Sequence, residues 1–209
     1  MTTPMSETTH ELRHPVIPAG QARSAVFRRT YDAELADVWD ACTNPERLRR
    51  WYQPVEGDLR LGGMFTQGEM GGGRIIACEP QRLLRVALGP GDPSPDQLEV
   101  RFSEHPDGGT VLEVEHATTL DSHEIGGKMY DAVYCMGGGY GPRLLSLDLH
   151  LRGELPDQDV TALHLNPSFG PAIQGSMAAI QNMLDQQVQI QRPNRRSANS
   201  ASDVDVVDG

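Results

Sequence analysis

The sequence of 209 residues contains little cysteine and comparatively few positive charges. Its three cysteines, Cys42, Cys78 and Cys135, are far apart and form no Cys-x-x-Cys pair, which argues against a disulfide framework and a zinc ribbon. We therefore expect a reducing, cytoplasmic location. Eighteen lysines and arginines stand against twenty-nine aspartates and glutamates, and the net charge of −11 repels phosphate groups. A nucleic-acid partner is not expected.

Long apolar runs are also missing. No segment reaches the apolar length that a membrane-spanning helix needs, and the first twenty residues contain no basic stretch followed by an apolar one. We therefore expect a protein that is not exported and has no membrane partner.

Motifs of common chemistries are missing as well. The chain has no Gly-x-Ser-x-Gly elbow, and no cysteine has the local signature of a nucleophile. His105, His116, His123, Glu115 and Glu124 lie close in sequence, but no pair has the His-Glu-x-x-His spacing that places two imidazoles on one helix face. The sequence predicts no catalytic nucleophile, no metal and no cofactor.

Glycine, in contrast, is concentrated in the segment YCMGGGYGP, residues 134–142. Three consecutive glycines before an amphipathic run suggest a phosphate-binding loop, but that loop needs a lysine and a serine or threonine that are absent here. We interpret these glycines as a flexible lead-in to the following helix, able to act as a gate, because glycine reaches unusual backbone angles at low cost.

The hydrophobic pattern divides the chain into ordered and disordered parts. Polar, aperiodic ends predict disorder over residues 1–22 and 192–209, which flank a domain over 23–153 and a helical extension over 154–191. Within the domain, periodicity and turn residues predict a strand over 24–33, short helices over 35–42 and 45–52, antiparallel strands over 55–120 and a helical segment over 144–151 that stops at Gly153. A further helix is expected around 177–190.

This order of elements is typical of the helix-grip fold, and the residues strengthen the assignment. The chain from about 24 to 151 resembles the START-like superfamily, also called SRPBCC, and within it the branch of homologues of the activator of the 90-kDa heat-shock-protein ATPase. The resemblance rests on Asp32-Ala33, Val38-Trp39, Thr43 with Pro45, Trp51, the hairpin from Gly57-Asp58 to Gly62-Gly63, and Glu79-Pro80 with Arg82-Leu83. It implies an α+β fold: a curved antiparallel sheet around a C-terminal helix, with two short helices after the first strand. It also implies a hydrophobic cavity between sheet and helix. An additional C-terminal helix is expected here.

The expected cavity suggests a set of ligand-binding residues: Trp51, Phe65, Ile75, Val100, Phe102, Leu112, Val114, His116 and Tyr140. Strict alternation places Leu112, Val114 and His116 on one face of a strand. An inward His116 would orient a ligand or act as an acid or base; the alternative is a buried histidine with a hydrogen-bond partner. Trp51 is either a core anchor or a pocket residue, and Tyr140 occupies the place that a tryptophan commonly takes in related chains.

Three functions remain open. The first, which we favour, is the binding of a small apolar or aromatic molecule under the C-terminal helix. The second is a cyclase- or hydrolase-like enzyme that uses His116 and Tyr140 to position a substrate and move a proton. The third is a co-chaperone-like or stress-related role with a protein partner, although fold alone does not determine activity. The sequence is compatible with a monomer or a homodimer.

Overall fold

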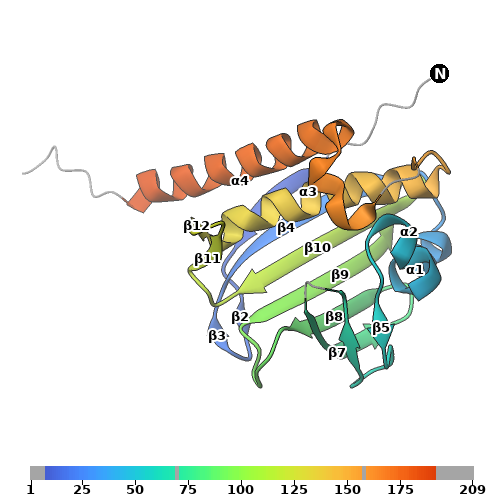
Figure 1. Cartoon of the computed structure of the whole chain (residues 1–209), viewed down its shortest axis with the longest axis horizontal. Helices are drawn as coiled ribbons and strands as arrows, with labels where there is room; N and C mark the ends of the chain where they lie inside the picture. Colours follow the sequence, from blue (N-terminus) through green and yellow to red (C-terminus); the bar gives the residue numbers. More distant parts are fainter. Residues whose placement is uncertain (1–7, 69–70, 157–158, 192–209) are drawn as a thin grey trace, which may run out of the picture.

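An antiparallel sheet of eight strands carries the helices on one of its faces (Figure 1). The computed structural model describes residues 8–68, 71–156 and 159–191. The strands are β1 (Thr9–Arg13), β2 (Val16–Ile17), β3 (Gly20–Gln21), β4 (Arg23–Tyr31), β5 (Glu56–Gly57), β6 (Met64–Thr66), β7 (Gly72–Glu79), β8 (Leu83–Leu88), β9 (Asp96–Glu104), β10 (Thr110–Thr118), β11 (Ser122–Ile125) and β12 (Lys128–Asp131). The order in the sheet is β1-β4-β10-β9-β8-β7-β6-β5, while β2–β3 and β11–β12 are separate hairpins.

The helices are α1 (Leu35–Thr43), α2 (Pro45–Trp51), α3 (Ala132–Leu151) and α4 (Gly170–Gln191), with short 3-10 turns η1 (Val160–Leu165) and η2 (Pro167–Phe169). Figure 1 shows α3 across the sheet, α4 alongside α3, and α1 and α2 together at one end. The predicted α+β helix-grip fold is confirmed, including the two short helices after the first long strand and the helix near the C-terminus. None of the helices in the described residues has both the length and the apolar character needed to cross a membrane.

Local sequence explains where the two short helices begin and end. Asn44 separates them, and its side chain accepts a hydrogen bond from the Glu46 backbone N–H at 3.0 Å. Pro45 occupies the first helical position, where a missing N–H costs nothing. The α2 helix then buries Leu48 and Trp51 against the sheet and α3, which is the anchoring role predicted for an amphipathic turn.

The prediction of disorder over residues 1–22 is wrong for residues 9–21. β1 pairs antiparallel with β4, from Thr9 opposite Arg28 to Arg13 opposite Ser24, and so forms one edge of the sheet. The segment has no hydrophobic period that would reveal a strand, and its order comes from backbone pairing with β4, its neighbour in the sheet. Residues 1–7 and the predicted tail 192–209 lie outside the described residues.

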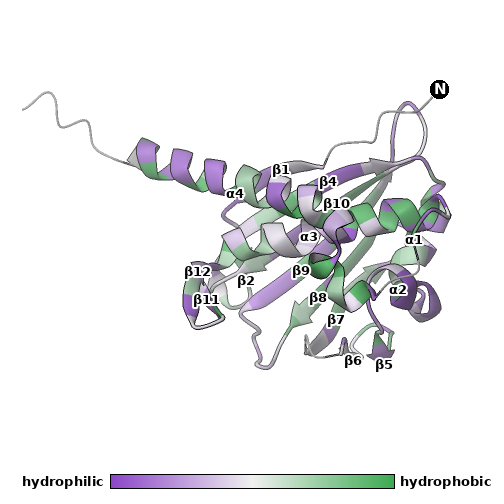
Figure 2. Cartoon of the chain, turned by 45° about the horizontal axis from the view of Figure 1, so that its top comes forward, coloured by the Kyte–Doolittle hydropathy of each residue, from purple (hydrophilic) through white to green (hydrophobic). Residues whose placement is uncertain are grey.

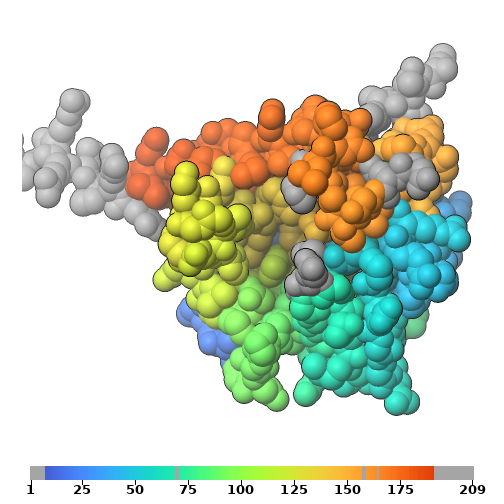
Figure 3. Space-filling view, viewed as in Figure 1, coloured from blue at the N-terminus to red at the C-terminus, as the bar shows by residue number. Residues whose placement is uncertain are grey.

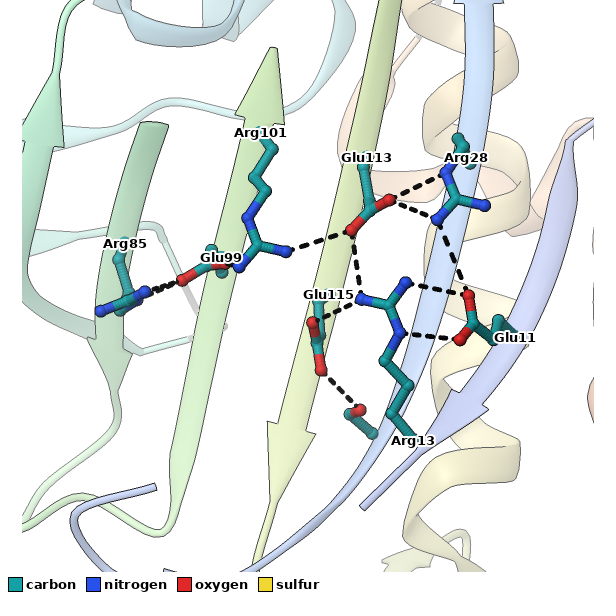
Figure 4. A network of polar contacts seen from close by, with 9 residues as sticks. Glu11, Arg13, Arg28, Arg85, Glu99, Arg101, Glu113 and Glu115 are labelled. Atoms are coloured by element: carbon teal, nitrogen blue, oxygen red, sulfur yellow. Dashed lines mark hydrogen bonds and ion pairs between the residues drawn. The ribbon is translucent and has the colours of Figure 1, made fainter. Parts of the chain in front are cut away.

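Charged side chains form a network on the sheet face opposite α3 (Figure 4). Arg13 donates hydrogen bonds to Glu113 at 3.2 Å and to Glu115 at 3.1 Å, and Arg28 donates to Glu113 at 2.8 Å. Burial favours a higher pKa for Glu113, but the hydrogen bonds from Arg28 and Arg13 outweigh it and hold that pKa below the usual value. The network therefore fastens β1 to β4 and β10 and leaves the apolar side chains to the other face.

The glycine segment is not a flexible lead-in to a helix, so the predicted gate is wrong. α3 begins at Ala132 and is capped by the Asp131 carboxylate, which accepts hydrogen bonds from the backbone N–H groups of Val133 and Tyr134. The three glycines lie in the helix interior. A Cβ atom on Gly141 would lie 2.6 Å from the carbonyl oxygen of Ala172 and 2.7 Å from Cβ of Ser176. Gly137 and Gly141 instead allow α4 to approach α3 closely, a packing reason that appears only when both helices are in place.

Candidate functional site

A cavity of about 400 Å³ lies between α3, the α1–α2 pair and the inner face of strands β7 to β10. Figure 2 shows hydrophobic stretches on α3 and on the strands beneath it, whereas the C-terminal half of α4 is mainly hydrophilic. Strand alternation produces the walls, since Val100 on β9 and Leu112 and Val114 on β10 all point to this face. The predicted space between the sheet and the C-terminal helix is therefore present.

The candidate residues fall into two groups. Those that line the cavity are Trp51, Phe65, Ile75, Val100, Leu112, Val114 and Tyr140. Phe102 is not among the lining residues; it is buried in the core, where its ring meets that of Trp39 edge-on with centroids 5.0 Å apart. The reason is that α1 covers this end of β9, so that Trp39 stands between Phe102 and the cavity. Trp51 combines both expected roles, because its indole N–H donates to the Ala41 carbonyl at 2.9 Å while it forms part of the wall.

His116 lies on the predicted face but behind the cavity wall. Its Nδ1 is 3.1 Å from the hydroxyl oxygen of Tyr140, and its Nε2 is 3.4 Å from Oδ1 of Asp96. Burial favours a higher pKa for Asp96, but the interaction with His116 prevails and lowers that pKa below its usual value. The result is a chain from Asp96 through His116 to Tyr140, and only Tyr140 reaches the cavity.

Tyr140 is held as a neutral phenol. Burial raises its pKa well above the usual value, and the neighbouring Tyr52 contributes in the same direction. Its ring packs against Phe27 with centroids 5.0 Å apart, and its hydroxyl faces His116. At neutral pH this residue therefore offers a hydrogen-bonding hydroxyl and no negative charge.

Polar residues of the wall that were not predicted include Tyr52, Gln67 and Arg143, and Thr43 also lines it. The Tyr52 hydroxyl donates to Oε1 of Gln67 at 2.9 Å, and Nε2 of Gln53 donates to the same oxygen at 3.0 Å. The Arg143 guanidinium lies over the Tyr52 ring, 5.3 Å from its centroid, and donates to the Gly139 carbonyl at 2.6 Å. A polar cluster in contact with an apolar cavity is a feature of specific ligand sites.

Cys42 lines the cavity but is not an activated nucleophile. Burial raises the pKa of the Cys42 thiol to about 12, so this cysteine stays protonated at neutral pH. Within the described residues, no three histidine, cysteine, aspartate or glutamate side chains come together in a way that could hold a metal ion.

A second cavity of about 560 Å³ lies on the other side of α3, beside the β11–β12 hairpin, η1 and α4. In the space-filling view a hollow separates the hairpin, in yellow, from the segment that contains η1, in orange (Figure 3). Arg143 lines both cavities, which makes its side chain part of the wall between them.

The comparisons with known proteins agree with this architecture. The family model described as AHSA1, Activator of Hsp90 ATPase homolog 1-like protein, matches residues 32–139. The solution structure of CalU16 from Micromonospora echinospora is 33% identical, covers 89% of this chain and 99% of that chain, and superposes with a TM-score of 0.72. Its crystal structure is 32% identical and covers 86% and 98%, with a TM-score of 0.66.

A more distant neighbour shares the fold alone. EF2215 from Enterococcus faecalis, described as a conserved protein of unknown function, is 14% identical, covers 85% of this chain and 92% of its own, and has a TM-score of 0.56. No curated protein matches the chain.

Proposed function

The chain belongs to the family of Activator of Hsp90 ATPase homolog 1-like proteins, with the START-like, SRPBCC-type fold, and on this premise we propose that it binds a small apolar or aromatic molecule in the cavity between the sheet and α3. A cavity of about 400 Å³ with mainly aliphatic and aromatic walls carries the proposal. This size lies in the range of small-molecule sites, and a ligand would supply the contacts that such walls otherwise lack. The three free cysteines support a reducing cytoplasm as its location.

We expect the fluorescent probe N-phenyl-1-naphthylamine to bind this cavity. Val114→Trp should weaken binding at least about tenfold, because Val114 is buried on the cavity face of β10 and an indole there occupies space that the probe needs. The increase in probe fluorescence on titration with protein measures the affinity. The matched control is Val111→Trp, on the opposite face of the same strand, which should bind the probe like the wild type.

The cavity is not a ligand site if the folded wild type does not bind the probe. Equal weakening by both tryptophan variants would instead mean that binding depends on β10 as a whole. Circular dichroism of each variant separates loss of binding from loss of structure.

One observation favours a second candidate function, an enzyme that enolises a bound aromatic ketone. The chain from Asp96 through His116 to Tyr140 ends at the cavity wall. In this reaction the phenolic proton of Tyr140 moves to the carbonyl oxygen of the ligand, while water takes a proton from the adjacent carbon and a C=C bond forms. The hydronium ion so formed gives a proton to His116, which passes a proton on to the Tyr140 phenolate, and Asp96 stabilises the transient imidazolium. The raised pKa of Tyr140 weakens it as an acid, so this candidate ranks second.

Deuterium exchange at the acidic CH2 group of 2-tetralone tests the enzyme candidate. Wild-type protein in D2O should accelerate exchange about 100-fold over buffer, as expected for general acid catalysis, and Tyr140→Phe should abolish the acceleration. NMR at saturating ketone measures the rate, so that a change in affinity does not enter. Equal rates with wild type, Tyr140→Phe and buffer would leave binding as the function.

A further inference from the structure

Most polar side chains of the cavity wall gather at one end; Thr43 is also in the wall, and its hydroxyl donates to the Trp39 carbonyl. Tyr52 comes from the end of α2, Gln67 from the segment after β6, and Tyr140 and Arg143 from neighbouring turns of α3. They are close to one another: Arg143 lies over the Tyr52 ring, and Tyr52 influences the pKa of Tyr140. The remaining walls come largely from aliphatic side chains of β7 to β10. A ligand that fits both parts has an apolar body and one polar end.

The polar end of the cavity presents hydrogen-bond donors. Oε1 of Gln67 accepts hydrogen bonds from both Tyr52 and Gln53, which leaves the Gln67 amide nitrogen as a donor with no acceptor among the described residues. Arg143 is also a hydrogen-bond donor, because a guanidinium contains no accepting atom. A ligand group at this end is therefore an acceptor.

The positive charge of Arg143 favours an acceptor that is an anion. Arg143 carries a positive guanidinium, which in an apolar cavity attracts a negative group more strongly than it would in water. It is also held in place, because Nη1 donates to the Gly139 carbonyl at 2.6 Å and the group lies over the Tyr52 ring. The chain as a whole carries a net charge of −11 and repels anions, so this local charge is what would select one.

We propose that the ligand of this cavity is an aromatic molecule with an acidic oxygen, present as a carboxylate, phenolate or enolate, and that the negative group binds Arg143 and Gln67 while the rings fill the space above the sheet. This inference rests on the proposed binding function. It adds the chemical class of the ligand and names the side chains that choose it.

Two probes with the same ring system test the proposal. 8-Anilinonaphthalene-1-sulfonate and N-phenyl-1-naphthylamine share the anilinonaphthalene body, and only the first carries an anionic group. The readout is the ratio of the two dissociation constants from fluorescence titrations. Arg143→Gln should shift this ratio against the anion about 10- to 100-fold, the effect of losing a hydrogen bond to a charged group. The anionic probe should also displace the neutral one, which places both in the same cavity.

Matched variants make the result specific. Arg49→Gln removes the same charge from an exposed position on α2, where Arg49 forms an ion pair with the exposed Glu46, and it should leave the ratio unchanged. Arg143→Lys keeps a positive charge and should retain most of the selectivity. Gln67→Glu adds a negative charge to the same wall and should shift the ratio against the anion even if Arg143→Gln does not fold.

The outcomes separate the two proposals. A wild type that binds neither probe overturns the binding function itself. Binding of the neutral probe, together with the same ratio in wild type, Arg143→Gln and Gln67→Glu, leaves the binding function standing and overturns the assignment of an anionic ligand. Loss of selectivity in Arg49→Gln to the same degree would also overturn it, because the preference would then come from overall charge.

Discussion

Asp148→Ala is expected to lower the free energy of unfolding by about 3 to 5 kcal/mol, the usual cost of breaking a buried ion pair. The Asp148 carboxylate on α3 accepts a hydrogen bond from Arg29 on β4 at 3.1 Å, and the side chains are only 4% and 5% exposed. Without the carboxylate, the Arg29 guanidinium stays buried beneath α3 with its charge uncompensated. Arg152, one turn further along α3, also pairs with Asp148, but its side chain is partly exposed, so water can solvate its charge when the carboxylate is removed.

Urea unfolding followed by circular dichroism measures this effect. Asp58→Ala is the control, because its ion pair with Arg60 is largely exposed and should contribute less than about 1 kcal/mol. The double variant Arg29→Met, Asp148→Leu should regain much of the loss, since it removes both charges together. A similar small loss for Asp148→Ala and Asp58→Ala would show that water reaches Arg29 in solution.

Gly141→Val should destabilise the fold by about 1 to 3 kcal/mol, as overpacked interfaces do. A Cβ atom at position 141 would lie 2.6 Å from the backbone oxygen of Ala172, and backbone cannot rotate out of the way. α4 must then move away from α3, which also strains the contact between His10 and Ser176, whose Nε2 and Oγ are 2.7 Å apart.

The matched control for this prediction is Gly175→Ala on α4. A Cβ atom there meets nothing within 4 Å, so the variant should gain up to about 1 kcal/mol from better helix propensity. Thermal and urea unfolding of the two variants check the opposite signs. If Gly141→Val is as stable as the wild type, close approach of the helices is not the reason for glycine at this position.

The parts of the fold that could be predicted are those that interactions between residues close in sequence determine. Alternation and turn residues identify β10 and its neighbours, and the Asn44-Pro45 pair marks the start of α2, because these signals act between residues close in sequence. β1 escaped prediction, since its order comes from pairing with β4 and from the ion pairs of Arg13 with Glu113 and Glu115. Neither interaction leaves a local pattern.

The residues in and behind the cavity wall likewise include some that local sequence places and others that only the tertiary structure places. Leu112 and Val114 could be placed on it because strand alternation decides which face a side chain takes. Asp96 is brought to His116 by the register of β9 against β10, in which Asp96 stands opposite Thr118. Arg143 carries no local sequence signal of a binding role, and only the docking of α3 over the sheet makes it the positive charge of an apolar cavity.

The sequence by itself determined the class of fold, the order of its elements and the apolar face of each strand, because backbone conformation and side-chain alternation follow from neighbouring residues. The tertiary structure alone decided that the glycines pack against α4, that Asp148 neutralises Arg29, and that Tyr52, Gln67 and Arg143 meet. Each of these depends on the distance between atoms that belong to separate elements. That distance is set by how the helices dock on the sheet, where burial makes an unfilled space, a clash or an unpaired charge costly.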